Sequence, residues 1–188
     1  VGVNPNPAHI INMSLGVEPG SLSATTSRAI DEVSERAYRA GTILFAASGN
    51  RGYSDHILAP ANSPWVYAVG SLDSNYERSS FSNYATDGAS VDFMAPGGSN
   101  PESGCYFILS TFPDDSYQCE GGTSMASPFV AGVAALILSQ EPGLNPAQLE
   151  TRLVSSSLFD SAYMSRAAYG NGVVCADRAL GASTLCGR

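Results

Sequence analysis

Charged residues and histidines are scarce in this sequence. Charged side chains make up 14% of the 188 residues and hydrophobic ones 44%, a balance typical of a folded globular chain and not of a disordered tail. Nine basic and 17 acidic side chains leave a net charge of -8, which repels phosphate backbones and anionic lipids. We therefore expect neither nucleic acid nor a membrane surface as a partner.

Long hydrophobic runs and a leader segment are also missing. The longest apolar run, Phe129 to Leu138, is about half of the ~20 residues that a membrane-spanning helix needs. The chain starts at Val1 without a basic segment followed by an apolar one, so we expect that any secretion signal has been removed. Such a start also suggests a processed product, as in a zymogen, or a truncated piece.

The four cysteines lack the Cys-x-x-Cys spacing of zinc sites. Of their three possible connectivities, the simplest joins sequence neighbours, Cys105 with Cys119 and Cys175 with Cys186. Each bond would add ~2–3 kcal/mol of stability by restricting the unfolded chain. Four free thiols are the alternative. Paired cysteines would make this a secreted, extracellular protein.

Buried strands and helices alternate along the chain. Short apolar runs predict strands at 10–13, 42–47, 65–69 and 91–94, and helical spacing predicts a helix from Ser23 to Ala40. This order favours a mostly parallel α/β sheet with right-handed crossovers. Ligands bind beyond the carboxyl ends of such strands, so the turns Ser14-Leu15-Gly16 and Ser48-Gly49-Asn50 should lie side by side.

Two helices are expected in the last third of the chain. The first opens at Gly121-Gly122-Thr123-Ser124 and has apolar residues on one face; the second has Asn145 as its cap, followed by Pro146 and Gln148. Without repeats or a linker, residues 1–188 are predicted to form a single domain.

The segment Gly122-Thr123-Ser124-Met125-Ala126-Ser127-Pro128 carries the strongest chemical signal. It sets a serine where a glycine turn enters a helix, where main-chain N–H groups lack helical partners and the helix dipole favours negative charge. A serine so placed can attack a carbonyl while its own N–H helps to hold the oxyanion. The alternative role for Ser124 is a helix cap.

The segment around Ser124 resembles the nucleophile motif of the subtilisin-like serine proteases (subtilases). Two more stretches resemble that family in the same order: Ile11–Gly16 looks like a strand and turn of the substrate cleft, and Ala46–Asn50 like the segment with the oxyanion-hole asparagine. The terminal Tyr169–Gly172 also fits. The resemblance implies a three-layer subtilisin-like α/β fold of which this chain is the C-terminal part of the catalytic domain, with the N-terminal portion absent.

The resemblance also implies roles for individual residues in a secreted serine endopeptidase. Ser124 would be the nucleophile that forms the acyl-enzyme, and the Asn50 side chain would donate to the oxyanion together with the Ser124 N–H. The substrate residue before the cut would enter a pocket with two walls. One wall would be Ser14, Leu15 and Gly16, and the other Ala47, Ser48 and Gly49. Small residues on both walls suggest a roomy, apolar pocket and broad specificity.

A catalytic base is the missing component, because a serine hydroxyl is a weak nucleophile at neutral pH. His9 does not fit the family motif, and Asp55 and His56 are adjacent in a loop where side chains rarely face each other. We therefore expect the catalytic Asp and His from an upstream segment or a separate chain, and this chain alone to be inactive. The alternative is a catalytically incomplete fragment or a noncatalytic peptide-binding relative.

Other hydrolase classes fit the sequence less well. An esterase elbow needs Gly-x-Ser-x-Gly, whereas Ala126 stands two residues after Ser124. Acid proteases with a Ser-Glu-Asp set also carry their acids upstream, and the residues after Ser124 fit subtilisins better.

The resemblance further implies a structural calcium ion and no catalytic cofactor. Family members often hold calcium with main-chain carbonyls after the oxyanion loop and a carboxylate near the fourth strand; Pro60–Val66 and Asp92 align there. A solvated strand-end aspartate is the alternative for Asp92. Two departures stand out: Phe129 replaces the usual histidine after the Ser-Pro pair, and the stretch 97–118 is longer than in compact relatives.

Overall fold

The centre of the protein is a parallel β-sheet. The computed structural model describes residues 8–86, 88–99 and 108–182. The strands run in the order β1-β2-β3-β4, and all neighbours are parallel; their bounds are β1 Ile10–Met13, β2 Ile43–Ala47, β3 Tyr67–Leu72 and β4 Phe93–Pro96. The predicted parallel α/β fold is therefore confirmed, with strand ends that differ from the sequence estimate by at most three residues.

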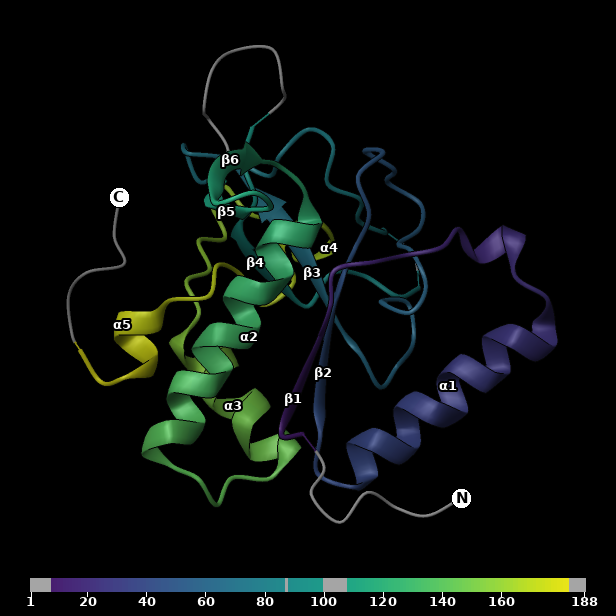
Figure 1. The fold of residues 1–188 in the computed structure, drawn as a ribbon, viewed down its shortest axis with the longest axis horizontal. Coiled ribbons are helices and arrows are strands. Elements are labelled where there is room, and N and C mark those ends of the chain that lie inside the picture. Colours follow the sequence, from purple (N-terminus) through teal and green to yellow (C-terminus); the bar gives the residue numbers. More distant parts are fainter. Residues whose placement is uncertain (1–7, 87, 100–107, 183–188) are drawn as a thin grey trace.

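Helices cover both faces of this sheet, which makes three layers (Figure 1). Helix α1 (Ala24–Arg39) follows β1 and lies on one side, after the short 3₁₀ turn η1 (Pro19–Ser21). Helices α2 (Thr123–Gln140), α3 (Pro146–Ser156) and α5 (Ala176–Ala179) lie on the other, and α4 (Arg166–Tyr169) lies near the end of β4. Two buried apolar clusters, one on each face, hold the layers together.

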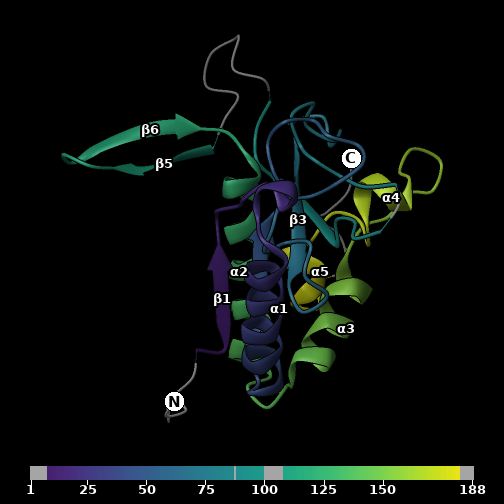
Figure 2. The same cartoon turned by 90° about the vertical axis from the view of Figure 1, so that its right-hand side faces the viewer.

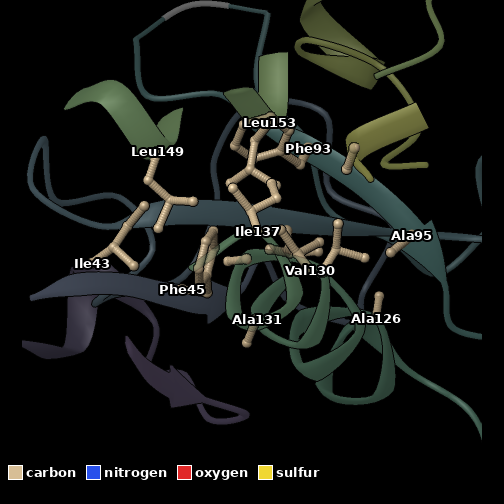
Figure 3. Close-up of a cluster of buried hydrophobic side chains, with 14 residues drawn as sticks. Ile43, Phe45, Phe93, Ala95, Ala126, Val130, Ala131, Ile137, Leu149 and Leu153 are labelled. Carbon is tan, nitrogen blue, oxygen red and sulfur yellow. The ribbon is translucent and has the colours of Figure 1, made fainter. Parts of the chain in front are cut away.

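Helix α2 forms the centre of the larger cluster (Figure 3). Val130 and Ile137 point toward Phe45 and Phe93 of the sheet, and Leu149 and Leu153 of α3 close the cluster. By length and composition alone α2 could also cross a membrane. Because it packs along all four strands, we interpret it as the core helix of the sheet.

The helix ends follow the predicted signals. The Ser23 side chain accepts the Thr26 N–H at the start of α1, and Gly41, with φ +97°, follows its end. Asn145 and Gln148 form a reciprocal capping box at the start of α3, as predicted. Local signals therefore determined both helices.

Strand β1 differs from its prediction as a buried strand. It pairs with β2 on one side only, and Ile11 is 37% exposed. An apolar run indicates a strand but not its neighbours, so the sequence could not distinguish an edge strand from a central one.

The long stretch before Ser124 contains a hairpin that the sequence reading missed. Strands β5 (Ile108–Phe112) and β6 (Ser116–Glu120) pair antiparallel and project from the body of the molecule (Figure 2). Asp114 and Asp115 form its tip with φ +61° and +51°.

Candidate active site at the start of helix α2

The carboxyl ends of β1 and β2 meet the first turn of α2. Ser14 follows β1, Asn50 follows β2, and Ser124 is the second residue of α2. Hydrogen bonds join these three segments although about 70 to 110 residues separate Ser124 from the other two in the sequence. The structure thus brings together the turns that sequence reasoning placed at one edge.

Asn50 is oriented by Thr123. Its Oδ1 accepts the Thr123 N–H and the Thr123 hydroxyl, both at 2.8 Å. Since a main-chain N–H can only donate, the amide oxygen must lie on this side and Nδ2 on the other. A Cβ added to Gly122 would lie 3.1 Å from Asn50 Nδ2, and Gly122 has φ +152°. The glycine therefore leaves room for a free amide donor beside Ser124.

Ser124 lies against the turn that follows β1. Its hydroxyl donates to the Ser14 carbonyl oxygen at 3.3 Å, and the Ser14 hydroxyl donates back to the Ser124 carbonyl oxygen at 2.6 Å. Pro128 stands four residues after Ser124 and has no N–H to offer that carbonyl. Ser14 therefore supplies the hydrogen bond that the helix itself cannot make.

The loop after β2 is clamped by Asn83, a residue that sequence reasoning missed. The buried Asn83 Oδ1 accepts the N–H groups of Arg51 and Tyr53 at 2.9 and 3.1 Å. The Ser48 hydroxyl donates to the Asn83 carbonyl, and the Asn83 N–H donates to the Gly49 carbonyl. No local sequence signal marks Asn83, because its partners are about 30 residues away.

Leu58 lies against both predicted pocket walls. A Cβ placed on Gly16 would lie 2.7 Å from Leu58 Cδ1, and one placed on Gly49 would meet Asn83 Nδ2 and lie 2.8 Å from Leu58 Cγ. A roomy pocket between these walls stays a prediction. The small wall residues indicate space, whereas the contacts of Leu58, from a third segment, argue against it.

Neither histidine is placed to activate Ser124. His9 precedes β1, at the opposite end of that strand from Ser14, and lines a hollow with the C-terminal half of α2. His56 Nε2 lies 2.9 Å from Glu18 Oε2, and Nδ1 lies 2.8 Å from Asp55 Oδ1. The Glu18 contact, more than that of Asp55, raises the pKa of His56 and favours its protonated form. Both ring nitrogens thus face carboxylates.

Comparison with known proteins agrees with this geometry. The model of the subtilase family (peptidase S8) matches residues 2–172. The chain belongs to the subtilase family. Subtilisin DY of Bacillus licheniformis is 42% identical over 174 residues, which are 90% of this chain and 56% of that protein. Subtilisin BL of Lederbergia lenta is 37% identical over 93% of this chain and 57% of its own length.

Two solved protease structures share the fold. A protease of Pseudoalteromonas arctica superposes with a TM-score of 0.77 at 36% identity, over 96% of this chain and 52% of that one. A lanthipeptide protease gives 0.80 at 25% identity, over 92% and 60%. The subtilisin-like fold is confirmed, and the chain spans about half the length of the curated relatives it matches.

Asp92 lies in a cavity at the other end of the sheet from Ser124. The cavity has a volume of about 500 Å³, and its lining includes Ser63, Trp65 and Glu150. The Ala68 N–H donates to Asp92 Oδ2 at 2.7 Å, but burial, the largest influence, raises the pKa of Asp92 to about 7. The buried Ser63 Oγ has no hydrogen-bond partner among the described residues.

The predicted disulfides lie only partly within the described residues. Cys105 and Cys186 are outside them, and the described part of the chain contains no free cysteine. The pairing of Cys105 with Cys119 and of Cys175 with Cys186 therefore stays a prediction.

Proposed function

We propose that this chain is the serine-bearing part of a subtilase endopeptidase, with Ser124 as the nucleophile that forms the acyl-enzyme. The observation that carries the proposal is the fixed Asn50 carboxamide: Thr123 holds its oxygen, and its Nδ2 donates no hydrogen bond to any described residue. A binding module has no need of such an oriented amide one residue from a half-buried serine hydroxyl at a helix start.

The mechanism follows from the positions of these groups. The Ser124 hydroxyl attacks the carbonyl carbon of the scissile peptide bond while a base takes its proton. The carbonyl oxygen becomes an oxyanion, which Asn50 Nδ2 and the Ser124 N–H stabilise; this N–H is at the second position of α2 and has no partner within the helix. The C–N bond breaks, the amine leaves with the proton, and water then hydrolyses the ester.

The base is proposed to come from an N-terminal portion of the same protease, as a histidine oriented by an aspartate. Supporting this, β1 pairs with no described strand other than β2, and both β1 and α2 expose apolar side chains. Ile11 is 37% exposed, and Phe129 and Leu136, which are on one face of α2, are 44% and 45% exposed. A further strand and its packing would cover these groups.

Labelling with a fluorophosphonate tests the proposal, because only an activated serine reacts. We expect rapid labelling of the complete protease, loss of the label with Ser124→Ala, and no labelling of this chain alone. The matched control, Ser139→Ala, changes an exposed serine at the other end of α2 and should keep the label. A complete protease that stays unlabelled would support a noncatalytic peptide-binding relative instead.

A structural calcium ion at the Asp92 cavity is also proposed. Among the described residues no three acidic, histidine or cysteine side chains form a metal site. The fit therefore depends on Asp92, on main-chain carbonyls of Pro60–Val66 and on the unpaired Ser63 hydroxyl, all oxygen donors of the kind calcium prefers. A cation would offset the unfavourable burial of the Asp92 carboxylate.

Secretion belongs to the same proposal. The two predicted disulfides are typical of an extracellular protein. Mass spectrometry of the secreted protein, with and without reduction, tests both disulfides.

A further inference from the structure

We propose that Leu58 closes the pocket for the residue before the cut, so that this protease cleaves after glycine, alanine or serine. The proposal rests on the proposed function, because it concerns the substrate of the same site. It assigns specificity to one residue of the segment between β2 and β3, outside both walls.

Leu58 is held between the walls by its main chain. Its N–H donates to the Ser48 carbonyl at 3.0 Å, on the wall that follows β2. The next residue, Ala59, exchanges two hydrogen bonds with Val17, at 2.8 and 2.9 Å, directly after Gly16 on the other wall. Because the Leu58 N–H is bonded to one wall and Ala59 is bonded to the residue after the other, Leu58 cannot move without breaking these hydrogen bonds.

The contacts involve the inner atoms of the Leu58 side chain. A Cβ on Gly16 would lie 2.8 Å from Leu58 Cβ, and a Cβ on Gly49 would lie 2.8 Å from Leu58 Cγ. Rotation about the Cα–Cβ bond moves Cγ and the methyl groups but leaves Cβ in place. A rotamer change therefore cannot clear the space beside Gly16, and a large side chain would have to displace the leucine there.

The space between Gly16 and Gly49 limits the size of the substrate side chain before the cut. A Cβ on Gly16 would meet Leu58, and one on Gly49 would meet Leu58 and Asn83, so Leu58 occupies the depth between the two glycines. A hydrogen atom, methyl or hydroxymethyl group needs no depth, whereas a phenyl or isobutyl group does. The chemistry of the pocket thus favours small residues over aromatic and branched ones.

Hydrolysis of peptides that differ only in the residue before the cut tests the proposal. For the complete protease, we expect kcat/KM for alanine to exceed that for phenylalanine by about tenfold or more. Leu58→Ala should reduce this ratio at least ~10-fold and Leu58→Gly further, since the glycine also removes Cβ. The control Leu138→Ala truncates a half-buried leucine near the end of α2 and should leave the ratio unchanged.

Binding separates this proposal from the catalytic one. In the complete protease with Ser124→Ala, calorimetry with peptides ending in alanine or phenylalanine needs no turnover. We expect the alanine peptide to bind about tenfold more tightly than the phenylalanine peptide. In the double variant with Leu58→Ala, this preference should reverse. Equal or tighter binding of the phenylalanine peptide, or binding of neither, overturns the role of Leu58. Failure of the fluorophosphonate label with the alanine preference intact overturns only the catalytic function.

Discussion

The two ends of the same sheet treat their polar groups differently. At the carboxyl end, the side chains of Ser14, Asn50 and Thr123 bond to one another or to main-chain groups of α2. At the amino end, Asp92 and Ser63 border a cavity in which the carboxyl group has a raised pKa and the hydroxyl has no partner among the described residues. At the first end every one of these side chains has a partner, whereas at the second the buried carboxyl group favours its neutral form.

Removal of the free amide at the carboxyl end should have the largest effect. In the complete protease, Asn50→Ala should lower kcat by about 10²–10³; this magnitude is carried over from the corresponding donor in subtilisin and is not a result of this structure. KM should change little, because the donor acts on the developing charge. Steady-state kinetics measure both, and a rise in KM with kcat intact would contradict the role.

At the amino end, Asp92→Asn should stabilise the chain at high pH. The pKa of Asp92 is about 7 in the folded protein against an ordinary 3.8, so the folded state holds a proton more tightly. Stability from this group is therefore lost as the pH rises from about 4 through 7. In a chelator, we expect the variant to gain about 1–2 kcal/mol at pH 8.5 relative to pH 5.

Urea unfolding at both pH values measures this difference. Calcium added at pH 8.5 should raise the stability of the wild type but not of Asp92→Asn. A calcium response that survives the substitution would exclude Asp92 as a ligand.

Thr123→Val should loosen Asn50 without removing it. The substitution keeps the main-chain hydrogen bond and the shape but deletes the hydroxyl, which donates to Asn50 Oδ1 at 2.8 Å and accepts the Gly49 N–H at 3.2 Å. We expect a loss of about tenfold in kcat, equal to ~1.4 kcal/mol, with KM unchanged. Thr151→Val, on the exposed face of α3, is the matched control, and equal losses in both variants would refute a positioning role.

The smallest expected effect concerns Ser14 and Pro128. Ser14→Ala should cost about 1 kcal/mol of unfolding free energy, because the Ser124 carbonyl loses its donor. In a Pro128→Ala background a main-chain N–H can replace that donor, so the cost should fall to a few tenths of a kcal/mol. A double-mutant cycle by urea unfolding measures the coupling, and strict additivity would show that the two residues do not share this carbonyl.

Sequence reasoning was most successful where the signal was local. Ser23, Asn145 and the glycine turn before Ser124 define helix starts through neighbours within three residues. The alternation of strand and helix then predicted which turns share an edge. It failed for β1 as a buried strand and gave no sign of Leu58 against the two walls, since both depend on segments distant in sequence.

The sequence by itself determined the family, the parallel sheet and the meeting of Ser14, Asn50 and Ser124, because periodicity, capping and motif spacing are properties of adjacent residues. Only the tertiary structure decided that Thr123 orients Asn50, that Leu58 lies between Gly16 and Gly49, and that Asp92 has a raised pKa. These features arise from packing and desolvation, which depend on which residues distant in the chain become neighbours in space.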